Sequence, residues 1–205
     1  MIDVIDAERK DRVANVLAES HLDTMICSSA SAVLLLSGYW PVMGESIVVF
    51  TKDGECHIVL PEDEVELAQR TSDAVLIPYQ PSTLAALTTP IDELVDPLRR
   101  LTTKLGLSHA AIGLQFDEAM QTATYVSSVE FRFSLLALLQ RLLPKANYRS
   151  CDRALEQMQA RKTAKELECI QRASQIAEAG FARAAEVVQV GRREAEIAAA
   201  LQAAF

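Results

Sequence analysis

Short apolar runs and amphipathic segments alternate along the first 150 residues of the chain. The apolar runs have the length and composition of buried strands, and they occupy residues 24–27, 46–50, 56–60, 74–77 and 110–114, with residues 147–151 as a further candidate strand. The amphipathic segments have the apolar spacing of helices. They cover residues 6–20, a stretch that opens at 61, 91–105 and most of 116–143, with a shorter helical or irregular piece at 31–36. This alternation predicts an α/β domain in which helices flank a sheet.

Capping and turn residues mark several boundaries of these elements. Asp6 fits the N-cap of the first helix. The pair Asp53-Gly54 predicts a hairpin turn, which makes the sheet mixed. Near-continuous apolar runs on both sides of this turn predict strands that are buried on both faces. Pro61 is placed as the first residue of the next helix, and Pro78 as the end of the strand that follows it.

The segment 159–205 has a different pattern, with small or apolar residues at alternating steps of three and four. This spacing places a seam on one side of a long helix, and we call it the apolar seam: Leu167, Ile170, Ser174, Ala177, Phe181, Ala184 and Val188. Thr163 and Glu166 fit a capping box at the start of the helix, and Gly191 fits its C-terminal cap.

A second helical pattern follows, and it has no end signal. Ile197, Leu201 and Phe205 lie on one of its faces. We therefore expect a first domain over residues 1–150. Residues 151–205 are expected to form a linker and the opening helices of a second domain whose remainder lies outside them. Since the apolar seam requires a surface to pack on, we also expect a homodimer, a higher homo-oligomer or an exchange of helices between chains.

Composition and charge narrow the classes of partner. The chain has a formal net charge of −8 and is 50% hydrophobic, and no basic patch interleaves with aromatic residues, so we do not expect nucleic acid as a partner. No apolar run has the length of roughly 18–20 residues that spans a bilayer. The acidic start lacks the basic region of a secretion signal. Together with four dispersed cysteines, these features predict a cytoplasmic protein with reduced thiols.

Residue types that carry chemistry are present but scattered. A carboxylate group at Glu62, Asp63, Glu64 and Glu66 has two interpretations, a metal site or a solvated helix N-terminus, and the second is favoured because adjacent helical positions point in different directions. The three histidines lie far apart in sequence and lack a second ligand at helical spacing. The sequence therefore predicts neither a catalytic residue nor a metal ligand within the chain.

One loop combines aromatic residues with flanking glycines. Residues 38–44 include Tyr39 and Trp40, and Trp40 is the single tryptophan of the chain. Aromatic residues on a loop can face a ligand or a partner, and they can equally form a hydrophobic plug over the core. Both interpretations stay open, with burial favoured.

Four features in order resemble the creatinase/aminopeptidase P/prolidase family, known as the pita-bread metallohydrolases. They are the strand at 22–26 after the opening helix, the sequence Leu36-Ser37-Gly38-Tyr39, the hairpin ending Ile58-Val59-Leu60-Pro61 before acidic residues, and Lys162-Thr163-x-x-Glu166-Leu167 with Gly191-x-x-Glu194. The resemblance covers essentially the whole chain. It implies a ribonuclease H-like N-terminal domain, followed by a helical segment that begins an incomplete pita-bread domain.

The resemblance also implies a function for a longer parent protein. Enzymes of this family hydrolyse amide or related C–N bonds with two divalent metal ions, usually manganese or cobalt, and all five metal ligands would lie beyond Phe205. The N-terminal domain of such enzymes mediates oligomer contacts and lends a loop to the active site of a neighbouring subunit. The resemblance makes Tyr39 and Trp40 the candidates for this substrate-access loop.

Three hypotheses follow. The first is the non-catalytic N-terminal part of an Xaa-Pro dipeptidase or aminopeptidase P-like enzyme that acts on peptides, with a creatinase-like amidinohydrolase that acts on a small C–N substrate as the alternative. The second is a stand-alone binding or dimerisation module without catalysis. The third is an unrelated small-molecule-binding domain, which predicts a pocket at the carboxyl end of a strand.

Overall fold

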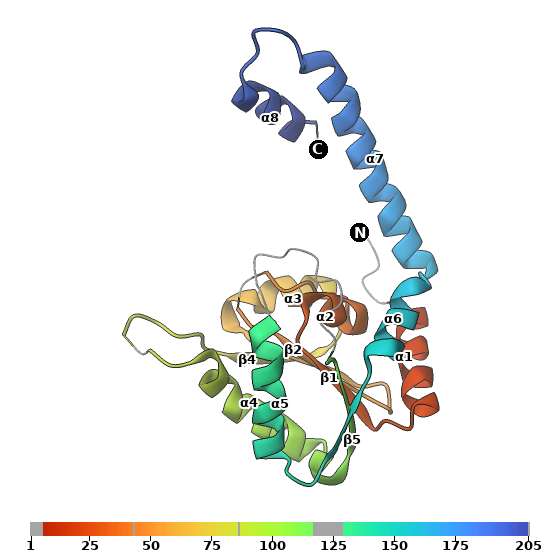
Figure 1. The fold of residues 1–205 in the computed structure, drawn as a ribbon, viewed down its shortest axis with the longest axis vertical. Helices are drawn as coiled ribbons and strands as arrows, with labels where there is room; N and C mark the ends of the chain where they lie inside the picture. The colour runs from red at the N-terminus through yellow and green to blue at the C-terminus, as the bar shows by residue number, and fades with distance from the viewer. Residues whose placement is uncertain (1–5, 43, 86, 117–128, 205) are drawn as a thin grey trace. The chain divides into compact units, whose positions relative to one another are not determined.

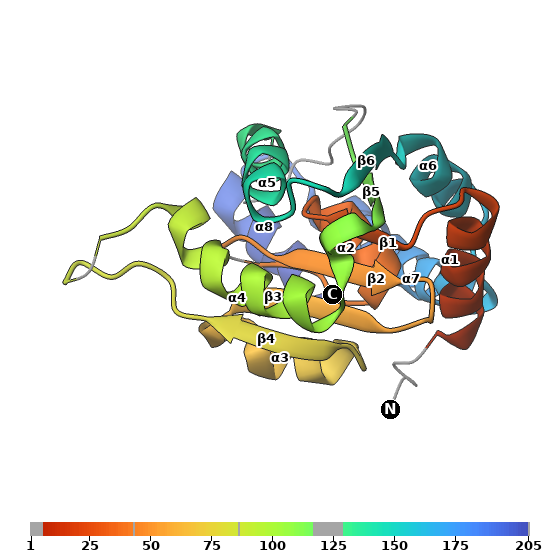
Figure 2. The same cartoon turned by 90° about the horizontal axis from the view of Figure 1, so that it is seen from below.

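The computed structural model describes residues 6–42, 44–85, 87–116 and 129–204. The chain divides into two compact units, residues 1–161 and residues 162–205. Unit 1 contains a sheet with helices on both of its faces, and unit 2 is helical (Figures 1 and 2). Within the described residues, no helix combines the length and the apolar character that crossing a membrane requires.

The described strands of unit 1 form one mixed sheet of six strands in the order β4-β3-β2-β1-β5-β6. The strands are β1 Thr24–Cys27, β2 Ile47–Thr51, β3 Cys56–Pro61, β4 Val75–Tyr79, β5 Ala111–Leu114 and β6 Asn147–Ser150. β2 pairs antiparallel with both β1 and β3, and the other neighbours are parallel. The mixed sheet and the hairpin between β2 and β3 confirm the predictions from the apolar runs and the Asp-Gly turn.

The helices of unit 1 cover two separate cores, one on each face of the sheet. These helices are α1 Ala7–Glu19, α2 Ala30–Ser37, α3 Val65–Thr71, α4 Pro90–Lys104, α5 Val129–Leu142 and α6 Asp152–Ala160. Successive residues of a strand point to opposite faces, so Met25 packs with α1, α2, α3 and α6 while Ile26 packs with α4 and α5. The same alternation along β2 and β3 buries these strands on both faces, as their continuous apolar runs predict.

Two of the proline assignments are wrong. Pro61 does not open a helix, because its pairing with Tyr79 makes it the last residue of β3. A 3₁₀ turn over Glu62–Glu64 follows, and α3 then begins at Val65. Pro78 does not end a strand, since it lies inside β4. β4 is an edge strand, where the missing N–H of proline costs no ladder hydrogen bond on the open side.

The helical prediction over residues 116–143 is only partly covered by the structure. Residues 129–142 form α5, and residues 117–128 lie outside the described residues. The predicted division after residue 150 also differs from the division into units by one helix. Leu155 and Met158 of α6 belong to the core beneath α1, so α6 is part of unit 1.

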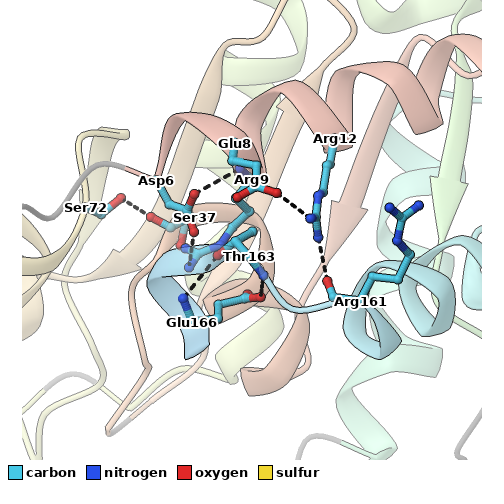
Figure 3. Close-up of polar contacts among 9 residues, drawn as sticks. All are labelled: Asp6, Glu8, Arg9, Arg12, Ser37, Ser72, Arg161, Thr163 and Glu166. Atoms are coloured by element: carbon cyan, nitrogen blue, oxygen red, sulfur yellow. Dashed lines mark hydrogen bonds and ion pairs between the residues drawn. The ribbon is translucent and has the colours of Figure 1, made fainter. Parts of the chain in front are cut away.

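Polar contacts fix the amino end of α1 and join it to the end of α6 (Figure 3). The Asp6 carboxylate accepts a 3.0 Å hydrogen bond from the Arg9 N–H and pairs with the Arg9 guanidinium at 3.3 Å, so Asp6 caps the helix as predicted. Arg12 forms an ion pair with Glu8 and donates a 2.6 Å hydrogen bond to the carbonyl of Arg161, the residue after α6.

Unit 2 consists of α7 Ala164–Val187 and α8 Glu194–Gln202. The capping box is confirmed: the Glu166 N–H donates to the Thr163 hydroxyl at 3.1 Å, and the Thr163 N–H donates to the Glu166 carboxylate at 2.8 Å. Gly191 does not cap α7, because the extended backbone of Val188 ends the helix earlier and Gly191 lies in the following turn with φ of 90°.

The apolar seam lies on α7 and on its C-cap residue Val188, and its large members are exposed. Leu167, Ile170 and Val188 are about half exposed, and Phe181 is 77% exposed. Since exposed apolar area on this scale is uncommon on isolated globular domains, the seam is a surface that lacks a cover within the described part of unit 2.

We predict that Gly113→Ala destabilises unit 1 through crowding in the core. A Cβ at this position of β5 would lie 2.8 Å from Leu22 Cδ1 and 3.1 Å from Cys151 Cβ. Overpacking of this kind costs about 1–3 kcal/mol of unfolding free energy, which urea denaturation measures. The Leu22 methyl resonances should shift in the same variant.

The matched control is Gly106→Ala, where an added Cβ meets no atom within 4 Å but φ is 68°. This variant should lose about 1 kcal/mol from its backbone conformation alone and leave the Leu22 resonances unchanged. A Gly113→Ala protein with wild-type stability would show that Leu22 and Cys151 can move away from β5 without cost.

Candidate functional site

The loop between α2 and β2, described over residues 38–42 and 44–46, begins at a position that requires glycine. Gly38 has a φ of 80° and donates its N–H to the Leu34 carbonyl at 2.8 Å, which ends α2. A Cβ there would lie 3.0 Å from the carbonyl oxygen of Thr71. Ser72, just after α3, also donates a hydrogen bond of 2.6 Å to the Ser37 carbonyl (Figure 3). The start of the loop is therefore fixed against the end of α3.

Glu64 anchors the first half of the loop from beneath. Its side chain is buried, and its carboxylate accepts a hydrogen bond from the Tyr39 hydroxyl and a 2.9 Å hydrogen bond from the Val42 N–H. Tyr39 is completely buried. Burial and the neighbouring Glu64 carboxylate raise the pKa of the Tyr39 hydroxyl far above its usual value, so this hydroxyl stays a neutral donor.

Tyr79, at the end of β4, anchors the second half. Its hydroxyl donates to the Glu45 carbonyl at 2.9 Å and accepts from the Glu45 N–H at 3.2 Å. Burial raises the pKa of this hydroxyl as well. A single phenol thus satisfies both backbone groups of one loop residue, just before the chain enters β2 at Ile47.

The two anchors hold Trp40 and Val42 at the surface. Trp40 is 39% exposed and Val42 is 44% exposed, while their neighbours Tyr39 and Pro41 are buried. The two aromatic residues predicted for the loop therefore have different environments, because Tyr39 is part of the core and Trp40 is exposed to solvent. We call residues 38–42 and 44–46 the anchored loop.

Sequence reasoning missed both anchoring side chains. The carboxylate group at 62–66 was expected to be solvated, and for Glu64 this is wrong, although Glu62, Asp63 and Glu66 are exposed. The 3₁₀ turn directs Glu64 inward, and pattern analysis that starts a helix at Pro61 cannot place that turn. The one signal that could have predicted a buried Glu64 is that a buried tyrosine hydroxyl needs a hydrogen-bond partner.

The histidines and cysteines of the described residues form no metal-holding cluster. His57 is buried, with its Nε2 3.3 Å from a Glu55 carboxylate oxygen, while His21 and His109 are exposed. Burial raises the pKa of the Cys56 thiol to about 12, so it is protonated at neutral pH. Within residues 6–42, 44–85, 87–116 and 129–204, no group of three or more His, Cys, Asp or Glu side chains is placed to hold a metal ion.

A small hollow lies at the carboxyl ends of the parallel strands β1 and β5. Its lining includes Ser28, Gln115 and Phe116, and its volume is about 10 Å³, which is room for about one water molecule. The buried Ser28 hydroxyl has no hydrogen-bond partner among the described residues. This is the position at which an unrelated small-molecule-binding domain would hold its ligand, but the hollow is too small for a metabolite.

Comparison with known proteins gives a consistent result across the chain. Residues 9–132 match the family model described as the creatinase/prolidase N-terminal domain. The chain is 24% identical over 199 residues to the Xaa-Pro dipeptidase of Pyrococcus furiosus, which covers 95% of this chain and 47% of that protein. The chain thus spans about half the length of this curated relative.

Solved structures show the same fold at lower sequence identity. The X-Pro aminopeptidase from Thermotoga maritima superposes with a TM-score of 0.70 at 18% identity, over 95% of this chain and 48% of that one. The creatinase/prolidase N-terminal domain of an X-Pro dipeptidase from Streptococcus pyogenes superposes with a TM-score of 0.53 at 14% identity, over 74% of this chain and 98% of that one. The mixed sheet with flanking helices is therefore a fold shared with these proteins.

We predict that Tyr39→Phe lowers the free energy of unfolding by more than the same substitution does at an ordinary buried tyrosine. The change removes a donor from the buried Glu64 carboxylate, and losing a hydrogen bond to a buried charged group costs about 2–3 kcal/mol. Tyr148→Phe is the matched control, because the Tyr148 hydroxyl donates to the neutral carbonyl of Leu143 at 3.0 Å, and its loss should cost about 1 kcal/mol. Urea denaturation of both variants makes the comparison, and equal losses would contradict the anchoring role of Glu64.

Proposed function

Because the chain belongs to the creatinase/prolidase N-terminal domain family, we propose that it is the N-terminal, non-catalytic part of an Xaa-Pro dipeptidase or aminopeptidase P-like hydrolase. The observation that carries this proposal is the family match over residues 9–132 in a chain that spans about half of its Xaa-Pro dipeptidase relative. Its role there is to shape access to the active site and to support assembly of subunits.

The chemistry of such an enzyme depends on two divalent metal ions, for which manganese or cobalt is our expectation. The described residues of this chain do not fit that group, because they hold no cluster of three or more metal-ligating side chains. In the proposed enzyme the ions, and the water that they activate, belong to a part of the protein outside these residues.

The anchored loop supports a role in substrate access. A partly exposed tryptophan provides a large, rigid apolar surface, and the hydrogen bonds to Glu64 and Tyr79 fix the backbone that carries it. Such a side chain covers the apolar part of a bound peptide and excludes water from it without a large loss of conformational entropy. Trp40 is the contacting residue in this proposal, and Tyr39 is a positioning residue.

The apolar seam supports assembly. Exposed side chains along one face of α7 need a cover in the working protein. We propose that this cover is the rest of the same hydrolase or a second copy of the chain, and that the protein acts in the cytoplasm as a homodimer or a higher homo-oligomer.

A hydrolysis assay tests the proposal. The 205-residue chain alone should not hydrolyse Xaa-Pro dipeptides with added Mn²⁺ or Co²⁺, whereas the product of the complete reading frame should, and a chelator should abolish its activity. Metal-dependent hydrolysis by the 205-residue chain would overturn the non-catalytic role. A reading frame that ends at Phe205 would favour the stand-alone binding or dimerisation module.

We predict that Trp40→Ala in the active enzyme lowers kcat/KM for Xaa-Pro peptides by about tenfold, which corresponds to about 1.4 kcal/mol of lost transition-state binding. The melting temperature is expected to fall as well, because Trp40 is only 39% exposed and its truncation removes buried apolar area, so kcat/KM is compared at a temperature where both proteins are folded. Leu84→Ala is the control, since Leu84 is 98% exposed and lies outside the anchored loop, and its kcat/KM should equal that of the wild type. An unchanged kcat/KM for Trp40→Ala would remove the loop from substrate access.

A further inference from the structure

A buried hydroxyl group lies at the hollow between the carboxyl ends of β1 and β5. Ser28 is only 5% exposed, and its Oγ forms no hydrogen bond with any described residue. Such a group costs free energy, because burial removes its hydrogen bonds to solvent and supplies none in return. Folded proteins satisfy nearly all of their buried polar groups, so we look for the partner of Ser28 in the hollow that Ser28 lines.

The fold directs Ser28 towards this hollow. Ile26 of β1 packs in the core with α4 and α5, and Ser28 follows it by two positions, just after the strand ends. Since alternate residues of a strand point to the same face, Ser28 continues the side on which Leu135 of α5 packs. Ile26, Leu114 and Leu135 line the hollow together with Ser28. The hydroxyl is therefore a polar group in an otherwise apolar wall.

Gln115, just after β5, contributes a second polar group to the same hollow. The Ser29 hydroxyl accepts a 3.3 Å hydrogen bond from the Ala32 N–H as the N-cap of α2, and it donates its own hydrogen to Gln115 Oε1 at 2.5 Å. This bond fixes the amide orientation, with the oxygen towards Ser29. The Gln115 Nε2 group then offers two N–H donors that no described residue accepts.

Size and charge select a water molecule as the ligand. The volume of about 10 Å³ admits one water molecule. None of the described lining residues is cationic, and the Asp152 carboxylate lies close by, because it accepts the Phe116 N–H at 3.0 Å. A small anion would therefore meet a negative charge without a positive one. A water molecule can accept from the Gln115 amide and either donate to or accept from the Ser28 hydroxyl.

We propose that the hollow is a binding site for one structural water molecule, which bridges Ser28 Oγ and Gln115 Nε2. This water joins the carboxyl end of β1 to that of β5. It also holds the Gln115 side chain that accepts from Ser29, the N-cap of α2, so it helps to position the helix that leads into the anchored loop. The inference concerns the chain itself and does not rest on the proposed peptidase function.

The sign of a stability change tests the proposal. Ser28→Ala is compared with the wild-type 205-residue chain by urea denaturation. With a bridging water, the substitution removes a satisfied hydrogen bond, and the equilibrium constant for folding should fall by about fivefold. Without a water, it removes a buried hydroxyl that has no partner, and the same constant should rise by about fivefold. A constant that rises or stays unchanged would overturn the proposal.

Ser72→Ala is the reference for the loss of a satisfied buried serine. Its hydroxyl donates a 2.6 Å hydrogen bond to the Ser37 carbonyl, so the folding constant of this variant should fall by at least about fivefold. Ser28→Ala should change the constant in the same direction as this reference, whereas an opposite sign for the two variants counts against the bridging water.

A crystal structure of the 205-residue chain identifies the ligand directly. The expected result is one ordered water molecule within about 3.2 Å of both Ser28 Oγ and Gln115 Nε2. A side chain that fills the hollow, or a hollow without electron density, would contradict the proposal. A chloride ion at this position, recognised by its anomalous scattering in crystals grown with chloride, would contradict it as well, because the site would then select an anion.

Discussion

Burial of the central strands on both faces is the constraint on which the rest of unit 1 depends. β1, β2 and β3 direct alternate side chains into two cores, so helices must cover each face. α1, α2, α3 and α6 cover one face and α4 and α5 the other. Apolar burial contributes roughly 25 cal/mol per Å², so this arrangement provides the main stabilisation and fixes where the connecting loops emerge.

The anchored loop is a consequence of that arrangement. The chain leaves α2 beside the core and must return to β2, so the polar groups near its path need partners inside the protein. Glu64 and Tyr79 supply these partners from two other elements, and Tyr39 completes the contact with Glu64. Buried charge is costly unless it is hydrogen-bonded, so Glu64 and the loop hold each other in place. A firm frame of this kind can present an apolar side chain such as Trp40 to a binding partner.

The family match and the geometry of the loop are independent observations that bear on different questions. The family match identifies an N-terminal domain, and the fold shared with the Thermotoga maritima aminopeptidase agrees with it. Neither shows what Trp40 does. The role proposed for Trp40 rests on its exposure between two fixed backbone segments, and the assembly proposed for the chain rests on the exposed seam along α7.

The sequence by itself determined those features whose causes are local. Apolar runs, the Asp53-Gly54 turn and the Thr163–Glu166 capping box depend on side chains within a few residues of one another, and each predicted its element correctly. Local rules were wrong for Pro61 and Gly191, because strand pairing and the extended backbone of Val188 determine the boundaries there.

Only the tertiary structure decided which polar side chains are buried and which aromatic residue is exposed. Glu64 and Tyr39 are 25 positions apart in the chain, and Glu45 and Tyr79 are 34 apart. Their meeting depends on how a helix, a turn and an edge strand pack against the sheet. Hydrogen bonds between such distant residues produce no periodic pattern in the sequence from which they could be predicted. The pattern around each partner reflects only the helix, turn or strand to which it belongs. The sequence therefore located the loop, and the packing decided that Tyr39 is its anchor and Trp40 its exposed surface.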